Sequence, residues 1–361
     1  MKKSRKSLTT IGTVLLMSAT MAAISACGTS TASNNGNTSG STSNTSSSTQ
    51  GSGSAKNVSG TITLYTSEPV QDATLYKNAF EKEYPNVKVN IFSSGTTQVI
   101  AKLMAEKQAG NVKADVLLLA DQPTFVQLKD QDMLLSYKSP EDSNIPSVFI
   151  DPKYDFVGTK ALSTGIVYNT NLVKTPPTDW SSLLDPSAKG KVIMPSPDFS
   201  GAAAYFAGVF SRTSGFGWDY FTSLKKNGLV VGSGNGSVLT AVENGQDAYG
   251  IIVDFMAVNA AQKGSPVKFV YPTSGLPVIT EPIGIVKSTQ NKAAAEAFED
   301  FVLSQAGQEV GVKMGYAPLR GGVTPPTGLK PSSDYKVLSV DPKTLADNRA
   351  QDIKKFDGLM K

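Results

Sequence analysis

From residue 60 onward, the chain alternates short runs of strand-forming residues with segments whose apolar residues have helical spacing, and this alternation constrains the fold most. Residues 61–65 and 87–92 have strand character, and an amphipathic segment follows each of them. Residues 116–119 form a continuous apolar run, which is typical of a strand buried on both faces of a parallel sheet. We therefore predict an α/β fold with helices on both sides of the sheet.

The rest of the chain continues this alternation. The predicted elements are strands at 166–169, 191–194 and 249–253, a long crossing strand at 277–286, and a helix at 291–303. About 300 residues are more than one hydrophobic core usually serves, so we expect two lobes.

The first 26 residues have the features of an export signal. Four basic residues precede an apolar stretch at 11–24, which is too short to span a membrane as a mature helix. These basic residues are Lys2, Lys3, Arg5 and Lys6. Residues 24–27, Ile-Ser-Ala-Cys, resemble a lipobox, where cleavage leaves a lipidated cysteine. We expect 1–26 to be a lipoprotein signal peptide and Cys27, the only cysteine, to be lipidated; an ordinary signal peptide with an incidental cysteine is the alternative.

After Cys27, the chain up to residue 59 consists almost entirely of Ser, Thr, Asn and Gly. Such a segment has little apolar surface to bury, so we predict a disordered tether at 27–59. About 33 residues of this kind reach roughly 30 Å. The arrangement predicts an exported protein that a lipid holds at the outer face of the bacterial cell membrane, on the extracellular or periplasmic side.

The charge and the residue types missing from the chain exclude several classes of function. The net charge is +4, and without the four basic residues before Cys27 the chain has 30 basic and 30 acidic residues. This balance gives no reason to expect a nucleic-acid partner. The chain contains no histidine, which excludes Ser-His-Asp and Cys-His nucleophile systems and most zinc sites. We expect no cofactor, no metal site and no enzymatic activity.

Several segments after the tether resemble a known family when their order and spacing are considered together. They are 164–169 (Thr-Gly-Ile-Val-Tyr-Asn), 239–245, 291–298 (Asn-Lys-Ala-Ala-Ala-Glu-Ala-Phe), 301–308 and 341–349. The chain resembles the solute-binding proteins of bacterial ABC importers, in the subgroup that binds ferric ion, 2-aminoethylphosphonate or sugar phosphates. The resemblance covers essentially everything after the tether.

The resemblance implies a type 2 periplasmic-binding fold, in which two α/β lobes are joined by two crossing strands and the ligand lies in the cleft between them. Lobe 1 would comprise 60–164 plus 279–361, and lobe 2 would comprise 165–278. The implied function is to capture a small anionic solute, such as 2-aminoethylphosphonate or a sugar phosphate, and to deliver it to an ABC permease with its ATPase. We expect a monomer.

Three other functions stay open at this point. The first is a ferric iron or ferric chelate binder of the same fold. The second is an accessory lipoprotein that reports a ligand to a membrane kinase. The third is a hydrolase on the same scaffold, for which Asp and Glu could act as acid and base although no activated nucleophile is visible.

Polar residues follow the predicted strands, at the edge where open α/β sheets bind ligands. Three of these segments are also helix starts rich in Ser, Thr and Gly, and a helix N-terminus is suited to an anion because its N–H groups are unpaired. The same residues are common N-caps, which is the alternative role. The expected ligand-binding residues are Thr66, Ser67, Ser94, Thr96, Asp121, Ser200, Gly201, Ser237, Asp254 and Glu281.

Asp254 and Glu281 follow apolar runs and are expected to hold the amino or hydroxyl end of the ligand, because a buried carboxylate needs a partner. The alternative for Glu281 is a pairing with a lysine or a loop-capping role. In ferric-binding relatives, adjacent tyrosines stand where this chain has Asp254 and Phe255, and their phenolates ligate the metal. This departure favours an organic phosphoester or phosphonate over iron.

Overall fold

The computed structural model describes residues 57–330 and 334–361. These residues belong to one compact unit. The predicted signal peptide, Cys27 and nearly all of the predicted tether lie outside the described residues. Among the helices of the described ranges, none is both long enough and apolar enough to cross a membrane.

The centre of the described part is a mixed β-sheet with the strand order β2-β1-β3-β10-β5-β8-β6-β7. These strands are β1 (Gly60–Thr66), β2 (Val87–Ser93), β3 (Val116–Leu118), β5 (Val157–Asn169), β6 (Val192–Pro195), β7 (Val230–Gly232), β8 (Tyr249–Val253) and β10 (Leu276–Val286). Short strands pair beside this path: β4 (Leu134–Leu135), β9 (Val267–Val270), β11 (Ala317–Pro318) and β12 (Val337–Leu338). The predicted α/β fold is confirmed.

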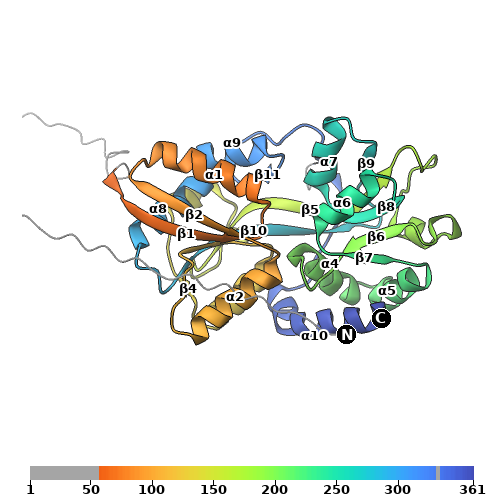
Figure 1. Cartoon of the computed structure of the whole chain (residues 1–361), viewed down its shortest axis with the longest axis horizontal. Helices are drawn as coiled ribbons and strands as arrows, with labels where there is room; N and C mark the ends of the chain where they lie inside the picture. The colour runs from red at the N-terminus through yellow and green to blue at the C-terminus, as the bar shows by residue number, and fades with distance from the viewer. Residues whose placement is uncertain (1–56, 331–333) are drawn as a thin grey trace, which may run out of the picture. The chain divides into compact units, whose positions relative to one another are not determined.

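Two long antiparallel strands, β5 and β10, connect the two halves of the sheet (Figure 1). One half contains the parallel strands β1, β2 and β3, and β3 pairs with β10. The other half contains the parallel strands β6, β7 and β8, and β8 pairs with the second part of β5. Strands that run from one half of the sheet into the other are typical of the connection between the lobes of a two-lobe fold. We use "first lobe" for the β1–β3 half and "second lobe" for the β6–β8 half.

Helices cover both halves of the sheet. The first lobe carries α1 (Val70–Glu83), α2 (Thr96–Gln108), α3 (Gln122–Asp130), α8 (Lys292–Leu303) and α9 (Gln305–Lys313). The second lobe carries α4 (Gly201–Arg212), α5 (Gly217–Lys226), α6 (Asn235–Glu243) and α7 (Asp254–Gln262). Short 3₁₀ helices lie in connections of the described part, among them η2 (Pro140–Asn144), η3 (Ser147–Phe149), η4 (Trp180–Leu184) and η5 (Pro186–Ala188).

The core agrees with the apolar pattern of the sequence. Val116, Leu117 and Leu118 are fully buried, which confirms the expectation for the apolar run at 116–119. In the second lobe, Trp180 packs its ring 5.2 Å from that of Phe206 and donates a hydrogen bond to the Gly275 carbonyl at 2.7 Å. Large buried aromatic rings of this kind supply much of a core's stabilisation.

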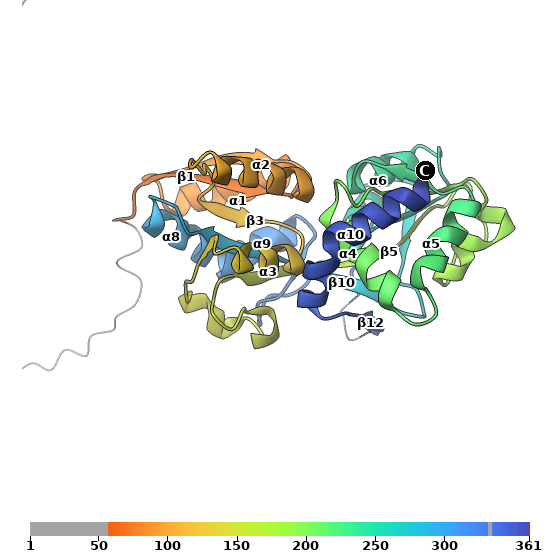
Figure 2. The same ribbon diagram turned by 90° about the horizontal axis from the view of Figure 1, so that it is seen from below.

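The last helix, α10 (Pro342–Met360), packs against α3 of the first lobe and against α4 and α5 of the second (Figure 2). Arg349 binds the carboxylate of Asp121 in the first lobe, with a shorter distance of 2.7 Å. Three residues further along, Asp352 accepts a hydrogen bond from Arg212 of α4 at 2.6 Å. Because α10 contacts both lobes, its assignment to lobe 1 stays a prediction.

Candidate functional site

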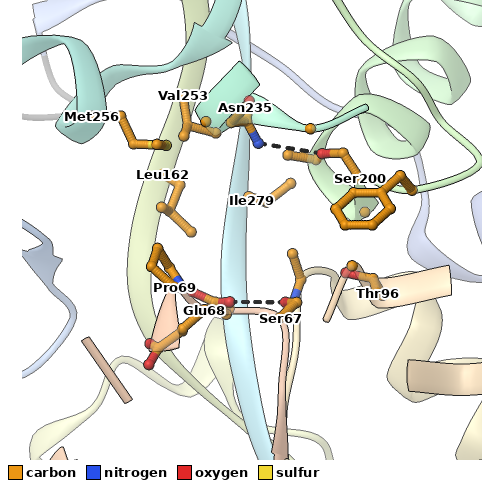
Figure 3. Close-up of a pocket in the computed structure, with 18 of the residues that line it drawn as sticks. Ser67, Glu68, Pro69, Thr96, Leu162, Ser200, Asn235, Val253, Met256 and Ile279 are labelled. Carbon is orange, nitrogen blue, oxygen red and sulfur yellow. Dashed lines mark hydrogen bonds between the residues drawn. The ribbon is translucent and has the colours of Figure 1, made fainter. Parts of the chain in front are cut away.

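A cavity of about 370 Å³ lies where the segments that follow β1, β2, β6 and β7 meet the crossing strands (Figure 3). This is the position that the rule for open α/β sheets predicts. Leu162 of β5 and Ile279 of β10 contribute an apolar wall, together with Val253 and Met256 around the start of α7. The cavity is therefore built from both lobes and from the strands that join them.

The starts of three helices line this cavity: Thr96 of α2, Gly201 of α4 and Asn235 of α6. The Ser200 hydroxyl accepts a hydrogen bond from the Ala203 N–H at 3.2 Å, and the Asn235 side-chain amide donates to the same hydroxyl at 3.3 Å (Figure 3). The two second-lobe helix starts are thus connected to each other. Each helix start provides unpaired N–H groups and about half a positive charge, so together they favour an anion.

The hydroxyl of Thr96 is the clearest sign that a ligand belongs at these helix starts. Thr96 lines the cavity, its side chain is 1% exposed, and its Oγ1 has no hydrogen-bond partner among the described residues. A buried polar atom without a partner costs about 1–3 kcal/mol. An acceptor atom of a ligand would remove that cost.

Two glycines allow the lobes to approach closely beside this hydroxyl. A Cβ at Gly201 would lie 2.3 Å from the Ala120 carbonyl oxygen and 2.6 Å from Thr96 Oγ1. A Cβ at Gly95 would lie 2.4 Å from the Phe199 carbonyl oxygen. At the same edge, the Gln98 side-chain amide of the first lobe donates to the carbonyl of Asp198 at 3.1 Å. The lobes are therefore in contact in this structure.

Carboxylates, not cations, line the other side of the cavity. Glu281 of β10 accepts a hydrogen bond from the Ser67 hydroxyl at 3.2 Å, and that hydroxyl accepts one from the Ala120 N–H at 2.9 Å. Glu68 also lines the cavity and is 2% exposed. Among the described residues, no Lys or Arg lines the cavity.

A buried lysine lies behind these carboxylates. Lys160 of β5 forms an ion pair with Glu68, and its Nζ is 3.4 Å from Oε2 of Glu281. The rings of Tyr76 and Tyr316 lie against the same ammonium group, with centroids 5.4 Å and 4.6 Å away. Burial alone would lower the pKa of Lys160, but the two carboxylates outweigh burial and raise it, so this side chain is charged.

Glu68 has an unusual electrostatic environment. Burial raises its pKa to about 7 against the lowering effect of Lys160, and the nearby carboxylate of Glu281 adds to the rise. Its Oε2 atom is buried and has no hydrogen-bond partner among the described residues. One ammonium group thus compensates two carboxylates.

The structure brings six of the ten predicted ligand-binding residues to this cavity. They are Ser67, Ser94, Thr96, Ser200, Gly201 and Glu281. Glu281 also has the alternative role considered for it, because it lies next to Lys160. Whether these residues contact a ligand stays a prediction.

Three other predicted residues have structural partners and do not line the cavity. The Thr66 hydroxyl donates to the Leu118 carbonyl at 2.8 Å, and Asp121 caps α3 by accepting from the Thr124 N–H at 3.0 Å. Ser237 lies in the first turn of α6, where its hydroxyl accepts from the Gly234 N–H at 3.2 Å. The contacts of Asp121 and Ser237 match the N-capping role that was the alternative to ligand binding, whereas the Thr66 hydroxyl joins the paired strands β1 and β3.

Asp254 begins α7 and is 3% exposed, but the cavity is lined by its neighbours Val253 and Phe255. Its carboxylate accepts hydrogen bonds from the Ser163 N–H at 3.1 Å, the Phe255 N–H at 2.9 Å and the Tyr271 hydroxyl at 3.2 Å. Burial raises the pKa of Asp254 to about 6, and these hydrogen bonds oppose the rise. The carboxylate thus ties α7 to crossing strand β5; its role as a ligand contact stays a prediction.

Sequence reasoning missed several residues that line the cavity. Glu68 is the second residue after β1, and Asn235 begins α6, so the local sequence gave a signal for both positions. The local sequence gave no such signal for Phe199 and Tyr316, because their position at the cavity depends on how the lobes pack. The apolar wall of the cavity was missed for the same reason.

The fold and the cavity define a two-lobe ligand-binding protein of the type 2 periplasmic-binding class. The family model of bacterial extracellular solute-binding proteins matches residues 111–342, more than half of the chain, and the chain belongs to this family.

Over 284 residues, the chain is 26% identical to a Salmonella typhimurium protein described as a putative 2-aminoethylphosphonate-binding periplasmic protein; the match covers 73% of this chain and 80% of the relative. Solved structures of periplasmic binding proteins share the fold. The periplasmic binding protein AfuA from Actinobacillus pleuropneumoniae, with exogenous fructose-6-phosphate bound, has a TM-score of 0.77 and 24% identity over 83% of this chain and 98% of its own. Iron-bound HitA from Pseudomonas aeruginosa has a TM-score of 0.73 and 22% identity over 82% of this chain and 99% of its own.

Proposed function

We propose that this protein is the solute-binding component of an ABC importer and that it captures a small solute carrying a phosphonate or phosphate group. The observation that carries the proposal is the set of three helix starts around one cavity, at one of which the buried Thr96 hydroxyl has no hydrogen-bond partner among the described residues. Helix N-termini bind phosphate groups without help from Lys or Arg, because their N–H groups supply both donors and positive charge.

The other side of the cavity supports a ligand with a second, hydrogen-bond-donating end. Glu281 and Glu68 line the cavity there, and both are acceptors. Between the two ends, the wall formed by Leu162, Val253 and Ile279 suits a short apolar linker. A phosph(on)ate with an amino or hydroxyl group, such as 2-aminoethylphosphonate or a sugar phosphate, has this arrangement. The described ligands of the Salmonella relative and of AfuA belong to the same class.

Ferric iron is the alternative ligand, because HitA is described as iron-bound. The residues around the cavity give it less support. In the described part of the chain, no group of three or more His, Cys, Asp or Glu residues is arranged to hold a metal ion. The Phe255 side chain has no oxygen to offer, and the Tyr316 hydroxyl donates to Asp72 at 2.8 Å.

The proposal includes how the protein works in its cell. The protein is exported and anchored through a lipid on Cys27, acts as a monomer, and presents both lobes to a permease driven by an ATPase. It performs no reaction on the solute. The lobes comprise 60–164 plus 279–361 and 165–278, and they open and close by bending of the crossing strands β5 and β10.

Thermal unfolding of the purified protein against a ligand panel tests this function. The panel contains 2-aminoethylphosphonate, ethylphosphonate, glucose 6-phosphate, glycerol phosphate, inorganic phosphate, polyamines and ferric citrate. A ligand at 100 times its Kd stabilises the folded state by about 2.7 kcal/mol, which moves the midpoint by several degrees. We expect a shift with a phosph(on)ate. A shift with ferric salts alone, or with polyamines alone, would refute the anion site.

A further inference from the structure

We infer that the site binds an ammonium group of its ligand in exchange for a proton held by Glu68. This inference rests on the proposed function and adds to it, because it selects ligands with a cationic amine over phosphate esters that carry only hydroxyl groups. It also assigns a function to the buried charges of Glu68 and Lys160, which the anion site alone does not explain.

The first observation is an imbalance of buried charge. Glu68, Glu281 and Lys160 are 2%, 4% and 2% exposed, so all three are removed from water. They carry two potential negative charges and one positive charge. Removing an uncompensated charge from water costs several kcal/mol, so the empty site favours a further positive charge or a proton.

The second observation is a missing hydrogen-bond donor. Oε2 of Glu68 is buried and has no partner among the described residues, whereas the other carboxylate oxygen of Glu68 pairs with Lys160. A proton on Glu68, or an ammonium group placed beside the two carboxylates, would supply the missing positive charge. Glu68 and Glu281 both line the cavity, so a ligand can reach this cluster.

The surroundings do not supply the missing positive charge. Asp72 of α1 adds a further carboxylate, which raises the pKa of Glu68. Tyr76 and Tyr316 face the cluster from α1 and from the segment before β11, and burial raises the pKa of both phenols, so they are neutral. Lys263, which follows α7, affects Asp72 electrostatically and is not among the causes that shift the pKa of Glu68. Burial raises the pKa of Glu68 to about 7, so the empty site takes up a proton as the pH falls below about 7.

The exchange balances in charge and atoms. The protonated, empty site takes up the ligand with its ammonium group and releases one proton from Glu68 to solvent. Binding and protonation therefore compete. Above pH 7, Glu68 is already ionised in the empty site, so its titration does not affect the affinity for the amine. Below pH 7, the affinity for the amine falls by about tenfold per pH unit, or about 100-fold by pH 5.

The experiment is isothermal titration of the whole protein at about pH 6 in two buffers that differ in ionisation enthalpy, which yields the number of protons released. The probes are 2-aminoethylphosphonate and ethylphosphonate. Because the phosphonate groups also titrate, the readout is the difference between wild type and Glu68→Gln with the same probe. Asp132→Asn is the matched control, since Asp132 is an exposed carboxylate paired with Lys287 away from the cavity.

For 2-aminoethylphosphonate, wild type and Asp132→Asn should release up to one proton more than Glu68→Gln, and only Glu68→Gln should have a flattened affinity profile between about pH 5 and pH 8. For ethylphosphonate, the three proteins should release equal numbers of protons. Equal release by all three proteins with the amine probe, or equal affinity of wild type for both probes at pH 8, would overturn the exchange and leave the anion site standing. If wild type binds neither probe and no phosphate ester from the panel, the proposed function itself fails and the inference fails with it.

If Glu68→Gln does not fold, measurements on the wild type alone still test the exchange of a proton for the ammonium group. Its affinity for 2-aminoethylphosphonate, corrected for the titration of the free ligand, must fall below pH 7 as stated. A corrected affinity that is constant from pH 5 to pH 8 overturns the exchange.

Discussion

Replacing Gly201 with alanine would place a methyl group in a gap that holds only a hydrogen atom. The new Cβ would lie 2.3 Å from the Ala120 carbonyl oxygen and 2.6 Å from Thr96 Oγ1. Ala120 and Thr96 belong to the first lobe, whereas Gly201 begins α4 of the second lobe. The clash therefore exists only while the lobes are in contact, and it should oppose closure over the ligand without affecting the separated lobes.

The size of the effect follows from the cost of overpacking. Forcing a methyl group into a packed contact typically costs about 1–3 kcal/mol. If that cost is restricted to the closed form, it lowers ligand affinity by roughly 5- to 150-fold. In the open, ligand-free protein the lobes are apart and the added methyl group meets no clash. The melting temperature of the ligand-free protein should therefore change by less than about 2 °C.

The assay is titration with the phosph(on)ate that gives the largest thermal shift, together with thermal unfolding without ligand. Gly358→Ala is the control, because it is a helical position where a Cβ meets nothing within 4 Å and which does not line the cavity. Unchanged affinity in Gly201→Ala would refute the argument that this contact belongs to the ligand-bound, closed form. A large loss of stability without ligand would mean that the contact persists in the empty protein.

Three further substitutions test other parts of the site. Thr96→Val removes a buried hydroxyl that has no partner in the described part of the chain, so the ligand-free protein should be as stable as wild type or more so, while phosph(on)ate affinity falls about tenfold. Unaltered affinity in titration would exclude this hydroxyl as a ligand contact. Lys160→Met leaves two buried carboxylates without their cation and should lower the free energy of unfolding by about 3–5 kcal/mol at pH 8. The loss in urea unfolding should be smaller at pH 6, where Glu68 takes up a proton; an equal loss at both pH values contradicts the account. Because burial raises the pKa of Asp254 to about 6, the folded protein binds an extra proton between about pH 4 and pH 6, and this group's contribution makes the protein more stable as the pH falls through that range. Asp254→Asn should remove that contribution, and a constant difference from wild type across the range would count against it.

The fold was largely predictable from local sequence. Strand β8 and helix α8 lie within one residue of the expected ranges, because their apolar patterns are strong. The first part of β5 was missed, since the segment contains glycine, lysine and serine and does not look like a buried strand. Lys160 can be buried there only because Glu68 and Glu281, both distant in sequence, meet it.

The candidate site was predictable only in part. Helix starts can be found from Ser, Thr and Gly after a strand, but which of them face the same cavity depends on how the lobes pack. Ser200 and Ser237 both lie next to a glycine at a helix start, yet Ser200 lines the cavity and Ser237 does not. Asp121 pairs with Arg349 of α10, a partner that local sequence does not reveal, and its role as a ligand contact stays a prediction.

The central claim is that a phosph(on)ate group binds at the starts of α2, α4 and α6, and a crystal structure with the best ligand of the panel tests it most directly. The account predicts phosphonate or phosphate oxygens within hydrogen-bond distance of Thr96 Oγ1 and of N–H groups at the starts of α4 and α6, with the ligand's other end against Glu281. A phosphorus atom bound elsewhere, or a metal ion held by tyrosine oxygens in this cavity, would contradict it.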